Sequence, residues 1–373
     1  MKRILVFDFI LSGHHLEYIH HLYQKAIVSS DEYYFCLPDD FIDVKNKMDW
    51  PSSSNVYFHL FPHISEDYSP LMKSLILCKQ VRKCCQEFQV SHAFFISLMS
   101  FLPFLPFFIP RGIKVSGIIY LIYLYRWKSE KLRHKALDIC KYLLLSKSSC
   151  FNKVFILNDK VAAYKFNRIY HTKKFLFIPD PFVPIGIQMI DDAFSSLKDS
   201  SDIVYLHFGA LSKRKGTLKI MNSLLIMDKT QLRNKTFLFL GKIQSDIYDE
   251  FYSLLASLKD RVKIIHYDEF CSFSIIASAC QVADYLLLPY ENVESSSGVI
   301  GYAAQFNTPV IAPSSGLLGK LVKRFSLGRT YDDKFDTAFE NCIKQTSKQH
   351  EIVSQKYLKT NTIDAFLTSI SFD

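Results

Sequence analysis

The sequence predicts an α/β protein with two open parallel sheets that carry helices on both faces. Short apolar segments alternate with stretches of helical spacing along the chain, as they do in βαβ units. This alternation runs in two series, separated by a proline-rich stretch at residues 178–192. The chain has 373 residues with 49% hydrophobic content. Because single cores stop growing at about 250–300 residues, we expect two domains.

The first series supplies the strands of one sheet. We expect strands at residues 3–10, 32–37, 54–61, 92–98, 114–121, 153–158 and 174–181. The apolar N-terminal run is broken by Asp8 and ends at Ser12, which fits a first strand better than a signal peptide.

The most apolar region of the chain is residues 92–127. It holds no uninterrupted apolar run of about 18 residues, so a membrane-spanning helix is not expected. The interruptions are Pro103, Pro106, Pro110, Arg111 and Lys114.

The second series supplies the strands of the other sheet. We expect them at residues 202–209, 235–241, 262–268, 284–290 and 308–314. Two such sheets facing one another would leave a cleft lined by the carboxyl ends of their strands, where open α/β sheets bind ligands.

Charge and cysteine content narrow the functional classes. The 45 basic and 36 acidic residues give a net charge of +9, concentrated in part at residues 126–135, next to the apolar region. This pattern suits anionic phosphates or peripheral contact of residues 92–135 with a lipid surface, and an ordinary solvated helix face is an equal alternative. No aromatic-basic repeat or helix-turn-helix pattern supports nucleic-acid binding. The nine cysteines show no repeated spacing, which predicts reduced thiols in the cytoplasm.

The first anion-binding pattern lies at residues 204–225. An apolar strand leads to Gly209, then to the cations Lys213, Arg214 and Lys215, and then to Gly216 and a helix. Glycine lets the backbone approach a ligand, and cations beside a helix start can hold a diphosphate. The alternative is a basic loop that is merely solvated.

The second pattern lies at residues 282–322. A strand ends in a loop with Ser295, Ser296, Ser297 and Gly298, and a helix begins near Val299. Hydroxyls and amides at a helix N-terminus form a neutral cradle for an anion. The alternative is that one serine only caps the helix, but a cap needs one hydroxyl and this loop offers three.

Together these segments resemble the donor half of GT-B glycosyltransferases of the retaining family 4, also called glycosyl transferases group 1. Residues 178–181 are similar to the family's interdomain link. The matching positions in the second half are Gly209, Lys215, Gly216, Ala283, Asp284, Pro289, Glu294, Pro309, Val310 and Ile311.

The resemblance implies a GT-B architecture, with two Rossmann-like domains facing across a cleft. Residues 1–185 would form the acceptor domain and residues 186–350 the donor domain, and residues 351–373 would form a helix that crosses back to the first domain. The implied activity is transfer of a sugar from a nucleotide-diphospho-sugar to a lipid-linked or polysaccharide acceptor, with retention of anomeric configuration. The enzyme would lie in the cytoplasm or at the inner face of the membrane.

The same resemblance assigns the chemical roles. Lys215 and Glu294 would be the catalytic residues: Lys215 would stabilise charge on the departing diphosphate, and Glu294 would contact hydroxyls of the transferred sugar. Nucleotide base contacts are expected near residues 241–244 and 267–272. No Asp-x-Asp motif is present, so we expect no metal and no cofactor beyond the nucleotide-sugar substrate.

Two positions depart from the family pattern. The arginine expected after Gly209 is Ala210, and the second of the paired glutamates is Tyr302. These changes mark either a subfamily or a non-catalytic nucleotide-sugar-binding subunit. A third possibility, a GT-B nucleotide-sugar epimerase, needs an acid/base set in the first domain that the sequence does not identify.

The segment from Ser12 to Leu22 holds four histidines. Gly13, His14 and His15 follow the first strand, so we expect them at the cleft or acceptor site. His14 and His15 would be neutral hydrogen-bond partners for acceptor hydroxyls or for the donor phosphate. Glu17, His20 and His21 are expected on a solvated helix face. His14, Glu17 and His21 share a face but lack a fourth ligand, which argues against a metal site.

Overall fold

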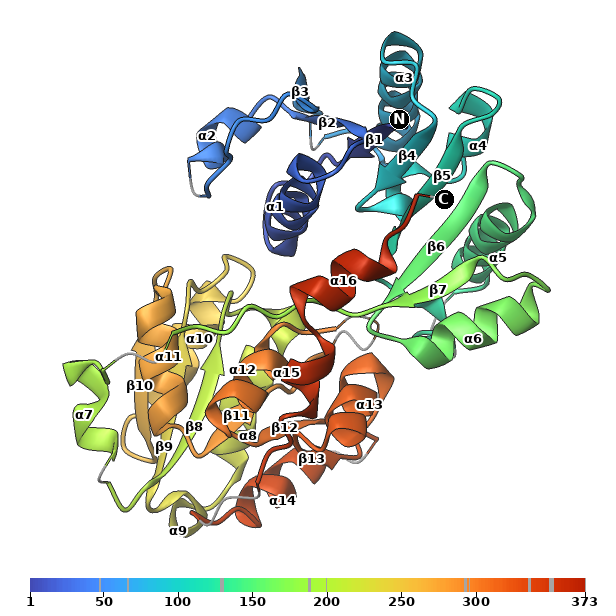
Figure 1. Cartoon of the computed structure of the whole chain (residues 1–373). Helices are drawn as coiled ribbons and strands as arrows, with labels where there is room; N and C mark the ends of the chain where they lie inside the picture. The colour runs from blue at the N-terminus through green and yellow to red at the C-terminus, as the bar shows by residue number, and fades with distance from the viewer. Residues whose placement is uncertain are drawn as a thin grey trace. The chain divides into compact units, whose positions relative to one another are not determined.

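The computed structural model of the chain falls into two compact units (Figure 1). It describes residues 1–46, 48–65, 67–127, 131–186, 189–198, 200–291, 294, 296–334, 337–348 and 352–372. Residues 1–181 and 363–373 form the first unit, and residues 182–362 form the second.

The first unit is built on a seven-stranded parallel sheet with the order β3-β2-β1-β4-β5-β6-β7. All seven strands lie where the sequence predicts them. Their bounds are β1 (Arg3–Phe7), β2 (Glu32–Pro38), β3 (Val56–Phe61), β4 (His92–Phe95), β5 (Lys114–Ile119), β6 (Phe151–Leu157) and β7 (Phe175–Ile178).

Helices cover both faces of this sheet because successive side chains of a strand point to opposite faces. Ile4 and Val6 of β1 share a buried cluster with residues of α1, whereas Phe7 packs on the ring of Phe101 at 5.6 Å. The helices are α1 (His14–Ile27), α2 (Phe41–Lys45), α3 (Pro70–Glu87), η1 (Leu98–Phe101), α4 (Leu105–Phe108), η2 (Tyr123–Tyr125), α5 (Leu132–Lys147), α6 (Lys160–Ile169) and α16 (Ile363–Ser369).

The second unit has a six-stranded parallel sheet with the order β10-β9-β8-β11-β12-β13. The sequence predicts five of these strands and misses β13, because Gly-Arg-Thr-Tyr is short and has no apolar run. The strands are β8 (Ile203–Phe208), β9 (Lys235–Leu240), β10 (Lys263–Tyr267), β11 (Tyr285–Leu287), β12 (Val310–Pro313) and β13 (Gly328–Tyr331).

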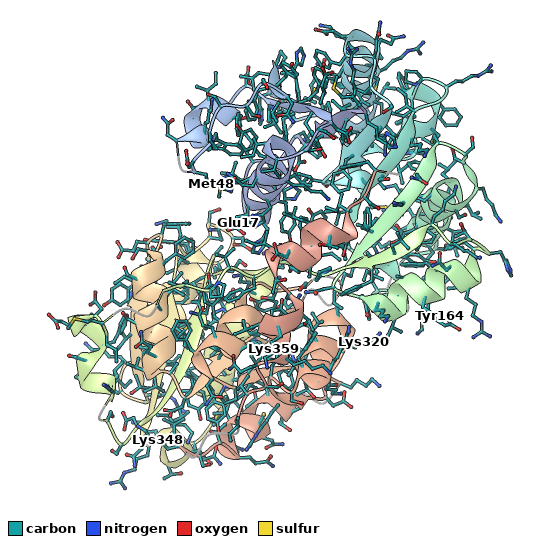
Figure 2. All side chains as sticks on the ribbon, viewed as in Figure 1. Glu17, Met48, Tyr164, Lys320, Lys348 and Lys359 are labelled. Carbon is teal, nitrogen blue, oxygen red and sulfur yellow. The ribbon has the colours of Figure 1, made fainter. Side chains whose placement is uncertain are left out.

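The helices of the second unit also cover both sheet faces. Tyr205 of β8 lies in a buried cluster with Ile220 and Leu224 of α8, while Phe208 contacts the ring of Tyr302 in α12. The helices are α7 (Asp192–Lys198), η3 (Lys213–Lys215), α8 (Thr217–Ile226), α9 (Lys229–Leu232), α10 (Tyr248–Leu258), α11 (Phe273–Val282), α12 (Val299–Phe306), α13 (Gly316–Phe325), α14 (Ala338–Lys344) and α15 (Lys356–Thr360). Figure 2 shows the exposed Lys348 and Lys359 side chains on this unit.

Each sheet reverses its strand order at one place. In the first unit this switch point lies between β1 and β4, and in the second between β8 and β11. Crossover helices leave opposite faces of the sheet on the two sides of a switch point, which opens a crevice at the carboxyl ends of the strands. The topology therefore directs attention to the loops after Phe7 and after Phe208.

The C-terminal segment forms two helices where the sequence predicts one. Asn361 separates α15, which contacts α12, from α16, which contacts α1 and β7. Lys25 of α1 holds the end of α16 by donating to the carbonyl oxygens of Leu367, at 2.7 Å, and Ile370.

The apolar region at residues 92–127 is divided among β4, η1, α4, β5 and η2. Among the described residues, no helix is both long enough and apolar enough to cross a membrane.

Candidate functional site

The second unit carries a glycine-lined site at its switch point. Gly209 follows β8 with φ of +95°, and Gly241 follows β9 with φ of +135°. A Cβ atom on Gly241 would collide with the carbonyl oxygen of Gly209, so the two turns pack backbone against backbone. Only glycine permits both the positive φ and this approach.

Lys215 reaches the same place from η3. Its ammonium donates to the carbonyl oxygen of Phe208 at 3.3 Å and lies 5.9 Å from the ring centroid of Tyr290. Within the part of the chain that the structure describes, no carboxylate forms an ion pair with it. A cation is thus fixed beside the switch point with its charge uncompensated by those residues.

His207 helps to position the loop that carries Lys215. Its Nδ1 donates to the carbonyl oxygen of Leu287 at 2.8 Å, and its Nε2 accepts from the hydroxyl of Thr217 at 3.0 Å. The Thr217 hydroxyl also accepts from the amide of Ser212 at 3.1 Å. Burial lowers the pKa of His207 to about 4, so the imidazole is neutral at pH 7. His207 therefore ties β8, β11 and the start of α8 together.

Part of the loop before α12 is held by hydrogen bonds within the loop and by a contact with the nearby Tyr290. The Ser297 hydroxyl is buried, lies 3.1 Å from the hydroxyl of Tyr290 and accepts from the amide of Val299 at 3.3 Å. The sequence predicts a cradle of hydroxyls and amides here. The Ser297 hydroxyl closes the turn onto the Val299 amide, and the anion contact stays a prediction. Glu294 is buried, Ser296 is half-buried, and Ser295 lies outside the described residues.

The basic loop at residues 213–215 packs against the loop that follows β11. Gly216 has φ of +72°, and a Cβ there would meet the carbonyl oxygen of Pro289. The amide of Glu291 donates to the carbonyl oxygen of Arg214 at 3.0 Å. The side chains of Lys213 and Arg214 are exposed, so Lys215 is the most buried of the three cations.

The two departures from the family pattern have different surroundings. Ala210 is exposed and leaves the place of the expected arginine without a long side chain. Tyr302 packs edge-on against Phe182 at 5.0 Å and against Phe208 at 5.5 Å. Tyr302, where the resemblance leads us to expect a second carboxylate, thus belongs to an aromatic cluster.

The loops expected near the nucleotide base lie together. Asp268 accepts from the amide of Ile243 at 2.9 Å and pairs with Lys242 at 3.1 Å. Gln244 donates from its amide to the carbonyl oxygen of Leu211 at 2.9 Å. These bonds join the loops that follow β8, β9 and β10.

The first unit carries a histidine-aspartate pair at its own switch point. Asp8 follows β1, is fully buried and accepts from the amides of Phe9 at 2.9 Å and Ile10 at 3.4 Å. Its second oxygen accepts from Nδ1 of His15 at 2.6 Å. This bond fixes the tautomer and leaves Nε2 as the ring atom that can accept a proton.

A stack of rings extends from this pair. His15 lies on Tyr120 at 5.2 Å, and Tyr120 lies parallel to Tyr18 at 6.2 Å. The Tyr18 hydroxyl donates to the buried carboxylate of Asp180 at 2.5 Å. The buried hydroxyl of Tyr120 has no hydrogen-bond partner among the described residues. Burial, reinforced by the charges of Asp8 and Asp180, raises the pKa of Tyr120 far above its usual value.

Solved structures share this arrangement of strands and helices along the whole chain. Anabaena HepE in complex with UDP-glucose is 15% identical, with a TM-score of 0.65 over 99% of this chain and 98% of that one. WaaG, a glycosyltransferase involved in lipopolysaccharide biosynthesis, is 12% identical, with a TM-score of 0.65 over 97% and 95% of the two chains. Sucrose-phosphate synthase from Thermosynechococcus elongatus is 14% identical, with a TM-score of 0.65 over 92% and 89%. The chain has the GT-B fold.

No protein-family model and no curated protein matches the sequence. The expectation of two Rossmann-like domains is confirmed by the two parallel sheets of the GT-B fold.

The histidines of the first GT-B domain separate differently from the sequence prediction. His14 is exposed and lies 3.2 Å from Glu17, while His15 is turned inward onto Asp8. His21, expected on a solvated face, is buried, and burial lowers its pKa to about 4. Glu17, visible in Figure 2, and His20 are half-buried. Gly13 caps the N-terminus of α1 with φ of +62°.

Sequence reasoning missed most of the ring stack. Asp8 was visible only as a charge that interrupts an apolar strand, and that interruption was the available signal. Tyr18, Tyr120 and Asp180 are brought together by the fold from distant parts of the chain. In the described part of the chain, no cluster of three or more His, Cys, Asp or Glu side chains could hold a metal ion.

Proposed function

We propose that the protein is a glycosyltransferase that uses a nucleotide-diphospho-sugar as donor. The observation that carries the proposal is the ammonium of Lys215, held 3.3 Å from the carbonyl oxygen of Phe208 beside the glycine turns of the switch point. Glycine turns admit a ligand close to the backbone, and the cation favours a diphosphate there. The fold shared with HepE bound to UDP-glucose supports the same assignment.

The proposed chemistry is loss of the nucleotide diphosphate from the anomeric carbon of the sugar. Negative charge grows on the departing phosphate oxygen, and a fixed cation lowers the barrier by stabilising that charge. Lys215 would take this role, assisted by Lys213, Arg214 and the loop from Ser296 to Gly298. Glu294 would bind hydroxyls of the sugar. Retention of configuration and independence from metal and cofactor are part of the proposal.

The test is an assay with the purified full chain and a panel of nucleotide sugars that includes UDP-glucose. Release of nucleotide and transfer of labelled sugar to added lipid-linked and polysaccharide acceptors are followed together. We expect Lys215→Gln to lower kcat by about 100- to 1000-fold, the usual cost of removing one such donor. Lys229→Gln, on the exposed start of α9, is the charge-matched control. Tight binding of nucleotide sugars without release or transfer would leave a non-catalytic binding subunit.

The proposal places the acceptor at a cytoplasmic membrane face, as in polysaccharide or lipid-linked saccharide synthesis. An apolar groove of about 970 Å³ lies between α4 and α5, with Phe107, Ile139 and Leu143 among its lining residues. Phe107 and Leu132 are strongly exposed, at 71% and 82%. Arg133, Lys135 and Lys147 lie on the same helix, α5. Exposed apolar side chains next to cations match an anionic lipid surface.

Vesicle sedimentation tests the membrane contact. We expect the protein to sediment with vesicles containing phosphatidylglycerol and to stay in solution with neutral phosphatidylcholine vesicles. Leu143→Glu should weaken sedimentation, whereas Ile226→Glu, at an exposed apolar position of the second unit, should not. Equal sedimentation of all three proteins would remove α5 from the proposal.

A second candidate function rests on the bond between His15 and Asp8. An epimerase needs an acid/base group in the first domain, and His15 with its tautomer fixed by the buried Asp8 is such a group. An epimerase would release nucleotide and an altered sugar in the absence of any acceptor. Acceptor-dependent transfer without an altered free sugar would exclude it.

A further inference from the structure

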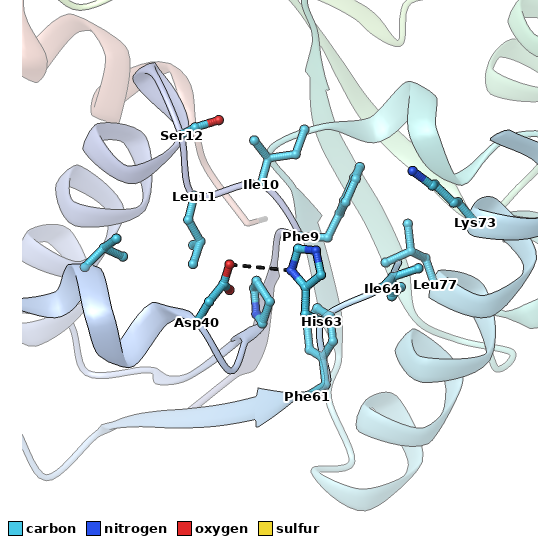
Figure 3. Close-up of a pocket in the computed structure, with 12 residues that line it drawn as sticks. Phe9, Ile10, Leu11, Ser12, Asp40, Phe61, His63, Ile64, Lys73 and Leu77 are labelled. Atoms are coloured by element: carbon cyan, nitrogen blue, oxygen red, sulfur yellow. Dashed lines mark ion pairs between the residues drawn. The ribbon is translucent and has the colours of Figure 1, made fainter. Parts of the chain in front are cut away.

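The first unit holds a cavity that the proposed donor chemistry does not use. It lies at the carboxyl ends of β1, β2 and β3 and has a volume of about 400 Å³, within the size range of small-molecule pockets (Figure 3). Its walls come from the loop after β1, from α2 and from α3. Most of the lining is apolar and includes Phe9, Leu11, Pro38, Val44, Phe61 and Leu77.

The lining argues against a saccharide as occupant. Each sugar hydroxyl that enters an apolar cavity loses its hydrogen bonds to water, which costs free energy unless a polar group replaces them. Here the apolar walls replace few of them, since the charged groups lie apart: Asp40 and His63 are on one side and Lys73 is on α3 (Figure 3). A hydrocarbon would instead gain free energy by filling the same space.

The charges of the cavity favour an anion at one place. The carboxylate of Asp40 lies 3.5 Å from Nδ1 of His63, apart from Lys73. Lys73 lines the cavity and forms no ion pair with any residue that the structure describes. An ammonium beside apolar walls suits a ligand with a hydrocarbon chain and a phosphate.

We infer that this cavity binds the hydrocarbon part of a lipid-phosphate acceptor, with the phosphate at Lys73. The inference rests on the proposed function and deepens it, because it selects a phosphate-bearing lipid over a polysaccharide as the acceptor. The apolar lining provides affinity for the chain, and Lys73 provides preference for the phosphate.

Farnesyl phosphate, a short isoprenoid phosphate, is the probe. Its binding to the full chain is measured by titration calorimetry below its micellar concentration, beside farnesol, inorganic phosphate and maltohexaose. We expect farnesyl phosphate to bind about tenfold more tightly than farnesol, the size of one charge-assisted hydrogen bond. Inorganic phosphate should bind the Lys73→Gln variant as well as it binds the unchanged protein, and maltohexaose should not bind.

Three variants locate the binding. Lys73→Gln should abolish the preference for farnesyl phosphate over farnesol, and Lys79→Gln, an exposed lysine on the same helix, should preserve it. Val44→Glu should weaken both lipids, and circular dichroism checks its folding. If Val44→Glu does not fold, the result for Lys73→Gln decides alone, because Lys73 is half-exposed and its substitution should not disturb folding.

Unchanged farnesyl phosphate affinity in Lys73→Gln, or binding of maltohexaose in its place, would overturn the inference. UDP-glucose binding is measured in the same preparations. A protein that binds UDP-glucose but not farnesyl phosphate keeps the proposed function and loses this acceptor. A protein that binds only the lipid keeps the cavity assignment and loses the transferase.

Discussion

The two units of this chain build their polar sites in different ways. In the second unit, residues 203–217 supply the strand, the glycine turn, Lys215 and the buried His207 within one continuous segment. In the first unit, Asp8, Tyr120 and Asp180 come from three distant parts of the chain. The part of a site that lies in one segment is visible as a motif, whereas contacts with other segments, such as Gly241 on Gly209, become visible only after folding.

The two sites also differ in the groups that form them. The second-unit site is formed by backbone, because Gly209 and Gly241 pack without side chains between them. The first-unit site is formed by stacked rings, of which His15 is held by Asp8 and Tyr18 by Asp180. The first arrangement suits a diphosphate, and the second fixes the direction of one imidazole.

Glycine substitutions should separate the two sites most strongly. Gly13 and Gly241 both have positive φ, but only Gly241 has a backbone oxygen where a Cβ would lie. We expect Gly241→Ala to lower the free energy of unfolding by about 4 kcal/mol and Gly13→Ala by about 2 kcal/mol, since the second pays backbone strain alone. Urea unfolding measures both. Equal losses would show that the close packing of Gly241 on Gly209 contributes nothing.

Acidification should destabilise both units. His207 and His21 each have a pKa lowered to about 4 by burial, against a usual value of 6.5. The unfolded chain therefore binds protons at a higher pH than the folded chain does. The free energy of unfolding is highest above pH 6.5 and falls as the pH drops towards 4. For the fully buried His207 the loss is about 3 kcal/mol. Urea unfolding at pH 7 and at pH 4.5 measures it, and NMR titration of His207 with a midpoint above pH 6 would contradict it.

Two tyrosines of the ring stack form a matched pair. Tyr18 donates to the buried Asp180, while the hydroxyl of Tyr120 has no partner among the described residues. Tyr18→Phe should therefore cost about 2 kcal/mol of unfolding free energy, because a buried carboxylate loses a donor. Tyr120→Phe should be neutral within about 0.5 kcal/mol. A larger loss from Tyr120→Phe than from Tyr18→Phe would reverse the assigned roles.

The histidine pair should show the smallest effect. His15 is fixed by Asp8, whereas His14 is exposed beside Glu17. In the transfer assay we expect His15→Gln to lower kcat/KM by about tenfold, the size of one lost charge-assisted hydrogen bond, and His14→Gln to leave it unchanged. Full activity of His15→Gln would remove it from the acceptor site.

The sequence by itself determined the alternation of strands and helices along the chain. Parallel strands buried on both faces must be apolar throughout. Of the thirteen strands that the structure describes, twelve stand out in the sequence, and the short Gly328–Tyr331 does not. Glycines with positive φ and a cation before a helix are local requirements, and this is why Gly209, Lys215 and Gly216 could be predicted.

Only the tertiary structure decided which polar groups meet. His21 is buried although its position on the helix suggested solvent, because packing against neighbouring elements overrides helical periodicity. The Ser297 hydroxyl contacts the hydroxyl of Tyr290 and accepts from the amide of Val299. Tyr302, where a carboxylate was expected, packs against Phe182 and Phe208. Asp8 and His15 are only seven residues apart, and their bond joins the loop after β1 to the start of α1. Such contacts depend on distances between segments, and a linear pattern of residue types does not specify those distances.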